Sequence, residues 1–172
     1  MNHHRLKAAL LAAAMITALC LSLTACGSSG SAGTGKKVYS IGVCQLMQHD
    51  ALDAATKGFQ DALNDKLGAE NVNCEVQVAS GDSDTCTTIV NSFVSKKVDL
   101  ILANATPALQ AAYNATTTIP ILGTAVTEYG VALNIDNFSG TVGGNISGTS
   151  DLAPLTEQAD MILEIVPDAK QV

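Results

Sequence analysis

The chain has 172 residues with 16 acidic and 9 basic side chains, which gives a formal net charge of −7. This acidic balance argues against a nucleic-acid interface or a surface for anionic membranes, because both need clustered lysine and arginine. The length suffices for one domain. With three phenylalanines, three tyrosines and no tryptophan, its core has to be built from alanine, valine, isoleucine and leucine.

Residues 1–25 have the pattern of an export signal: a basic start, then an uncharged and mostly apolar run over residues 8–23. The tetrapeptide Leu-Thr-Ala-Cys that ends at Cys26 resembles the bacterial lipobox. In that motif the cysteine becomes the mature N-terminus and carries a diacylglycerol, with acyl chains such as palmitate. The alternative is a transmembrane anchor, but the run is short for a span, and glycine and serine follow it where charges are usual. We expect a lipid anchor in the cell membrane that holds the protein on the extracytoplasmic side.

Residues 26–37 are rich in glycine and serine, which predicts a flexible tether. Gly30 to Lys36 also fits the phosphate-loop pattern up to its lysine, but Lys37 replaces the required Ser/Thr and no strand precedes the loop. We therefore expect no nucleotide site, and no cofactor. Without the signal, 7 basic and 16 acidic residues remain, a net charge of −9.

From residue 38 onward, apolar runs alternate with helical patterns. Strands are predicted at 38–47, 74–79, 98–105 and 119–126, and helices follow the first three of them. Asp50 and Asp82 are the expected caps of the first two helices, and Gly68 ends the first. Three β-α units followed by a strand predict an α/β fold: a parallel sheet with helices on both faces, in the strand order 2-1-3-4 with room for a fifth.

The third strand and its following turn are the centre of the predicted binding site. The run 98–105 is apolar on both faces, as is typical of a strand buried in a parallel sheet. Thr106 is expected to cap a helix over 107–115, because its hydroxyl accepts from free N–H groups and Pro107 has none to leave unpaired. Open α/β sheets bind small ligands above the carboxyl ends of their strands.

The remaining segments carry weaker signals. Residues 127–146 are rich in glycine, asparagine and serine, with a weak strand pattern at 130–135, and an amphipathic helix is predicted at 154–166. Cys74 and Cys86 lie at opposite ends of the predicted sheet, too far apart to form a disulfide. A disulfide between Cys44 and Cys86 stays an open possibility. Small buried thiols are the default expectation, and no Cys/His spacing resembles a metal site.

Several strings in this order resemble bacterial ABC-transporter substrate-binding proteins of the tryptophan/tyrosine-binding type. They include Val-Asp-Leu-Ile-Leu-Ala-Asn-Ala-Thr-Pro-Ala at 98–108, Gly-Gly-Asn-Ile-Ser-Gly-Thr-Ser-Asp at 143–151, and the segments 39–46, 49–55, 58–63, 119–121, 124–127 and 165–170. The resemblance implies a Rossmann-like lobe of a periplasmic-binding-protein fold, over 38–148. It also implies that 149–172 form the crossover and the start of a second lobe that is otherwise missing. Where the family commonly has Thr-Asp-Pro, this chain has Thr127, Glu128 and Tyr129.

Six residues are candidate ligand contacts. Gln45, His49, Thr106, Thr127 and Glu128 lie at or just after predicted strand ends, and Asp151 lies near the expected crossing between the lobes. Thr106 is the leading one, because a helix N-terminus attracts a carboxylate; plain capping is compatible with this role. His49 would otherwise only cap the first helix. Glu128 would otherwise be an exposed carboxylate in a loop. Ser150 and Asp151 are either contacts or caps of the final helix, and Asp82 is expected to be only a cap.

Three functions follow from these patterns. The first is a lipid-anchored receptor for an ABC importer of an amino acid, of the aromatic type, or a similar small solute, working with a permease and an ATPase and doing no chemistry. The second is a sensory module that reports the ligand to a membrane kinase or chemoreceptor; neighbouring genes would separate the two. The third is an exported enzyme, ranked last because no nucleophile is placed to use His49 as a base.

Overall fold

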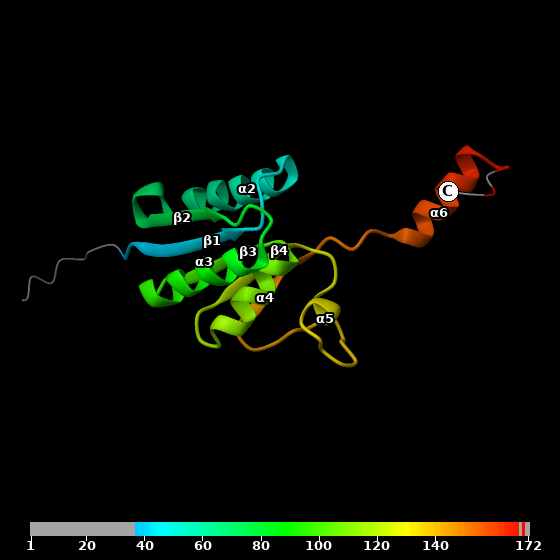
Figure 1. The fold of residues 1–172 in the computed structure, drawn as a ribbon. Helices are drawn as coiled ribbons and strands as arrows, with labels where there is room; N and C mark the ends of the chain where they lie inside the picture. Colours follow the sequence, from blue (N-terminus) through cyan, green and yellow to red (C-terminus); the bar gives the residue numbers. More distant parts are fainter. Residues whose placement is uncertain (1–36, 169, 171–172) are drawn as a thin grey trace, which may run out of the picture. The chain divides into compact units, whose positions relative to one another are not determined.

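The computed structural model describes residues 37–168 and 170, which form a five-stranded parallel sheet with helices on both faces (Figure 1). The order is β2-β1-β3-β4-β5, so the predicted α/β class and the order 2-1-3-4 with a fifth strand are confirmed. The predicted export signal, Cys26 and nearly all of the tether lie outside the described residues. The elements are β1 (Tyr39–Gln45), α2 (Asp50–Leu67), η1 (Ala69–Asn71), β2 (Val72–Val78), α3 (Ser83–Lys96), β3 (Leu100–Asn104), α4 (Thr106–Ala115), β4 (Ile121–Val126), α5 (Tyr129–Ala132), β5 (Ile146–Ser150) and α6 (Leu155–Ile165).

The main core lies between the sheet and the helices α3 and α4, on the face away from α2 (Figure 1). Helix α3 buries Cys86, Ile89, Val90 and Phe93 in this core, and Val94 is partly buried. The Phe93 ring packs directly on Gly42 of β1, where a Cβ atom would lie 2.5 Å from the ring carbon Cγ. Glycine at this strand position therefore makes room for the largest fully buried side chain of the core.

The opposite face of the sheet is less completely covered. Along the 18 residues of α2, only Thr56 is buried. A cavity of about 360 Å³ opens between α2 and the neighbouring strands, lined by Ala55 and Phe59 from the helix and by Leu102 and Leu122 from the sheet. Packing on this side is therefore looser over β4 and β5 than it is beneath α3.

Two helix starts differ from the predictions. The N-cap of α2 is His49, not Asp50: the His49 ring nitrogen Nδ1 accepts from the Ala51 N–H at 3.2 Å. The N-cap position of α4 is Ala105, which has no side-chain cap, and Thr106 is already inside the helix. Ala105 has φ +97°, a conformation that costs energy for an alanine and that helix propensities give no reason to expect. Asp82 caps α3 as expected, accepting from the Thr85 N–H at 2.8 Å.

The segment after β4 also corrects the predictions. The weak strand pattern at 130–135 was misleading, because Tyr129–Ala132 form the short helix α5 and the Ile135 N–H closes the turn on the Gly130 carbonyl. The fifth strand is β5, which runs two residues past the predicted lobe boundary at 148. Helix α6 matches the predicted final helix within one residue at each end, and none of its residues is buried. No helix in the described part of the chain is long and apolar enough to cross a membrane.

The three cysteines of the described segment are free. Cys44 and Cys86 are fully buried, as expected, while Cys74 is half-buried. The Cys44 sulfur lies 4.0 Å from the Cys86 carbonyl oxygen. Burial raises the pKa of both buried thiols, which keeps them in the unreactive protonated form.

Candidate functional site

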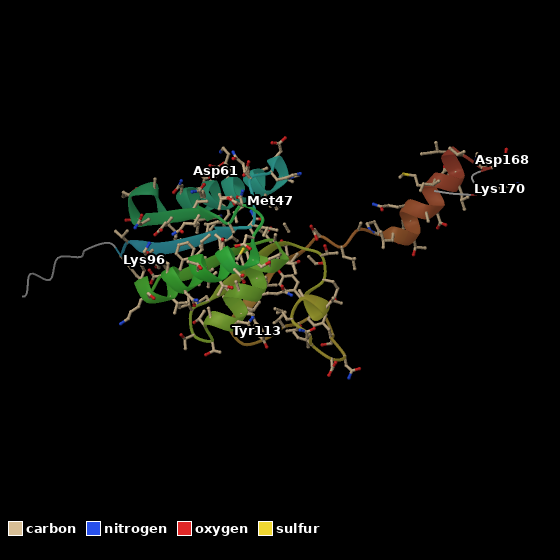
Figure 2. The ribbon with its side chains drawn as sticks, viewed as in Figure 1. Met47, Asp61, Lys96, Tyr113, Asp168 and Lys170 are labelled. Atoms are coloured by element: carbon tan, nitrogen blue, oxygen red, sulfur yellow. The ribbon has the colours of Figure 1, made fainter. Side chains whose placement is uncertain are left out.

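The carboxyl ends of β1, β3, β4 and β5 meet along one edge of the sheet, which we call the rim: residues 45–49, 104–106, 124–128 and 149–152. Met47, just after β1, marks this edge in Figure 2. Backbone hydrogen bonds join the neighbouring strand ends, from Leu46 N–H to the Asn104 carbonyl (3.1 Å), from Ala105 N–H to the Thr124 carbonyl (3.0 Å) and from Asp151 N–H to the Val126 carbonyl (3.1 Å). The structure therefore brings all six predicted site residues to one edge.

Gln45 is the most enclosed of the predicted contacts, with 2% of its surface exposed. Its amide nitrogen donates to the Met47 carbonyl at 2.8 Å and to the Asp53 carboxylate at 2.6 Å, and its amide oxygen accepts from the Thr56 hydroxyl at 2.7 Å. Both amide hydrogens are therefore used within the chain. In this arrangement Gln45 supports the rim from below.

His49 and Thr106 present polar groups at the rim surface. His49 is exposed, and its capping role is confirmed by the contact of its Nδ1 with Ala51; the other ring nitrogen, Nε2, makes no hydrogen bond within the described residues. Thr106 is half-buried, and within the described residues its hydroxyl makes no hydrogen bond. Both residues stay predicted ligand contacts.

Glu128 has a structural task at the rim. Its two carboxylate oxygens accept from the Gly130 N–H at 2.8 Å and the Val131 N–H at 2.6 Å, so it caps α5. Thr127 is exposed, and its carbonyl accepts from the Ser150 hydroxyl at 2.7 Å. Asp151 is exposed as well. Neither Ser150 nor Asp151 caps α6, whose N-cap position is Pro154 without a side-chain bond, so that alternative was wrong.

A buried polar network beneath the rim was missed by the sequence reasoning. The Asn104 amide nitrogen donates to the Leu52 carbonyl at 2.8 Å and to the Thr56 hydroxyl at 2.9 Å. Thr56 donates on to Gln45, which donates to Asp53. The Asn104 amide oxygen is buried and has no partner among the described residues. Asn104, a polar residue at the end of a mostly apolar run, was the signal in the sequence from which this network could have been suspected.

The arrangement suits binding rather than covalent chemistry. The N-terminus of α4 opens onto the rim, and the N–H groups of its first turn lack partners inside the helix, which favours a carboxylate there. Elsewhere in the lobe, a cavity of about 570 Å³ runs between α5 and β5, and its lining includes the rim residues Glu128, Ser150 and Leu152. In the described part of the chain, no cluster of His, Cys, Asp or Glu is placed to hold a metal ion.

Residues 40–172 match the family model described as ABC transporter substrate binding protein. The chain belongs to this family. It is 42% identical over 142 residues to a tyrosine-binding protein of Clostridioides difficile strain R20291. The aligned region covers 80% of this chain and 40% of that protein. The family name denotes binding proteins, not enzymes.

Two solved structures share the fold. One is the ligand-free, open structure of a substrate-binding protein with adhesive properties from Clostridium difficile (TM-score 0.69, 40% identity, covering 77% of this chain and 45% of that one). The other is a Streptococcus pneumoniae ABC domain in complex with L-Trp (TM-score 0.69, 31% identity, covering 77% and 45%). The chain thus spans less than half the length of these relatives.

Proposed function

We propose that this chain contributes one wall of a site for an aromatic amino acid, or a similar small zwitterion, in the binding component of an ABC importer. The observation that carries the proposal is the half-buried Thr106 hydroxyl, which has no partner in the described chain, at the open N-terminus of α4. Relatives named for binding tyrosine and L-Trp support the aromatic class. A permease and an ATPase would complete the importer.

The proposed contacts divide by the charge they offer. The α4 N-terminus and Thr106 would hold the carboxylate, because the helix dipole and free N–H groups favour an anion. Glu128 and Asp151 would face the ammonium group, since a carboxylate that already accepts two hydrogen bonds still has lone pairs available. Gln45, with both amide hydrogens occupied, would act by supporting the rim. His49 and Thr127 complete the exposed rim.

An NMR titration of the ¹⁵N-labelled chain with L-Trp and L-Tyr tests this assignment. One wall offers few contacts against the cost of association, so we expect dissociation constants on the order of millimolar. Amide shifts should be confined to the rim, with the largest at Thr106 and Ala108. The Thr106→Val variant should lose most of these shifts at matched ligand concentration, because a hydrogen bond to a charged group is worth about 1.5–3 kcal/mol.

Thr87→Val is the matched control, because Thr87 lies exposed on α3 and its hydroxyl bonds only to its own helix. It should leave the titration unchanged. Both variants should keep the melting temperature of the parent chain. Rim shifts that survive unchanged in Thr106→Val would remove Thr106 from the site, and an absence of shifts with every amino acid would contradict the proposed ligand class.

We further propose that Cys26 is lipidated and anchors the protein outside the cytoplasm. The support is the lipobox with its preceding export signal, both of which lie outside the described residues. Expression in bacteria fed an alkyne-tagged palmitate should label the chain and place it in the membrane fraction. Cys26→Ala should lose the label, whereas Cys20→Ala, inside the signal, should keep it. Label retained in Cys26→Ala would overturn the proposal.

A further inference from the structure

The Tyr129 side chain lies across two paired glycines at the end of the sheet. Gly123 of β4 and Gly148 of β5 face each other in register, and a Cβ atom on either would collide with the Tyr129 hydroxyl oxygen. Tyr129 is 7% exposed, and its hydroxyl donates to the Thr149 carbonyl at 3.2 Å. The two glycines therefore make the space in which the phenol reaches the backbone of β5.

This contact falls where the pairing of β4 with β5 becomes irregular. After the Gly123–Gly148 pair, the next pair is Val126 with Ser150, so one strand carries an extra residue. Ala125, in that stretch, has φ +52°. A bulge of this kind disrupts the local ladder of backbone hydrogen bonds. The Tyr129 hydroxyl supplies Thr149 with a partner at the point of the disruption.

Residues 149–152, which we call the crossover segment, are tied by further bonds to the end of β4 and the loop that follows it. The Ser150 hydroxyl donates to the Thr127 carbonyl at 2.7 Å and accepts from the Leu152 N–H at 3.3 Å. The Asp151 N–H donates to the Val126 carbonyl at 3.1 Å. No hydrogen bond in the described chain ties residues 153 and 154 to the sheet. The Asp151 N–H is therefore the last group of the segment that bonds to β4, and Leu152 is held through its bond to Ser150.

We propose that Tyr129 is a positioning residue that fixes the direction in which the crossover segment leaves this lobe. The inference rests on the proposed function, since a second wall of the site would be set by that direction. It makes Leu152 the last residue that moves with the sheet, so any closing motion bends the chain at 153 and 154. It also gives the Glu128-Tyr129 pair two separate tasks: Glu128 caps α5, and Tyr129 holds β5.

Amide hydrogen exchange of the full chain tests the proposal with Tyr129→Phe, which keeps the ring and removes only the hydroxyl. Loss of one hydrogen bond should speed exchange at Asp151 about three- to tenfold, because local opening carries its own free energy. Exchange at Ile101 and Ile121, in the buried strands, should not change. Tyr113→Phe is the control: Tyr113 is exposed on α4 (Figure 2) and should leave all three amides unchanged.

Two results would overturn the proposal: unchanged exchange at Asp151 in Tyr129→Phe, or an equal acceleration at Asp151, Ile101 and Ile121, which would mean that the hydroxyl merely stabilises the whole domain. If Tyr129→Phe fails to fold, the wild-type chain still decides. Its buried phenol should give a slowly exchanging hydroxyl proton with a cross-peak to Gly148, and a hydroxyl that exchanges as fast as that of Tyr113 would contradict the contact.

An alkaline titration adds a spectroscopic signature. Burial, followed by the negative charge of Asp151, raises the pKa of Tyr129. Because the chain has no tryptophan, absorbance near 295 nm reports tyrosine ionisation, and Tyr129→Phe should remove the component that ionises at the highest pH. These readouts need no ligand. A failed titration with L-Trp would count against the proposed function alone, while the exchange data decide on Tyr129.

Discussion

Phe93→Ala is expected to lower the free energy of unfolding by about 3–5 kcal/mol, the usual cost of deleting a fully buried phenylalanine. The ring is completely enclosed between α3 and β1, and it packs on Gly42, which has no side chain to fill the space that the ring would leave. Rigid strand backbone borders the cavity, so little collapse can compensate. Urea unfolding followed by circular dichroism measures the difference.

Phe59→Ala is the matched control for this prediction. Phe59 is half-buried on α2, beside the open cavity of the less covered face, so less apolar surface and fewer packing contacts are lost. Its effect should be less than half that of Phe93→Ala. Equal effects of the two variants would contradict the conclusion that the core is concentrated under α3 and α4.

Thr56→Val is expected to lower the free energy of unfolding by about 2–6 kcal/mol, although valine has nearly the same shape. The hydroxyl donates to Gln45 and accepts from Asn104, so its removal leaves two buried polar groups without that partner, at about 1–3 kcal/mol each. The Asn104 amide oxygen already lacks a partner among the described residues. The substitution therefore adds further unpaired groups to the same buried network. Urea unfolding at neutral pH gives the measurement.

Thr88→Val provides the comparison, because Thr88 is exposed on α3 and its hydroxyl bonds only to the Asp84 carbonyl. A surface change of this type should stay within about 0.5 kcal/mol. If Thr56→Val proves as mild as Thr88→Val, the network beneath the rim contributes nothing to stability and Gln45 is not held by it. The rim would then have to be positioned by backbone bonds alone.

The strand order could be predicted because each strand carries a strong local signal. Mostly apolar runs at 98–105 and 119–126 indicate strands of a parallel sheet, and right-handed β-α connections then allow few orders. The same reasoning placed five of the six candidate contacts at or just after the carboxyl ends of the strands, and the structure finds them at one edge. Residues 127–146 carry only a weak strand pattern, and their short helix depends on the Glu128 cap, so the reasoning failed there.

The tasks of individual rim residues could not be predicted, because their partners are distant in sequence. Gln45 has the same polar character whether it faces solvent or lies beneath α2, and only the return of Asp53 and Thr56 over the strand end encloses it. Ala105 was unpredictable for another reason, since alanine rarely adopts a positive φ and the fold imposes it.

The sequence by itself determined the α/β class, the strand order, the edge of the sheet that carries the candidate site and the family resemblance, because apolar runs and short motifs are local properties. The tertiary structure decided which polar groups at that edge are already bonded and which are open. It buried Gln45 and Asn104, turned Glu128 into a cap and brought Tyr129 onto β5. Hydrogen bonds between residues such as Asn104 and Thr56 exist only once the chain has folded, so no local pattern encodes them.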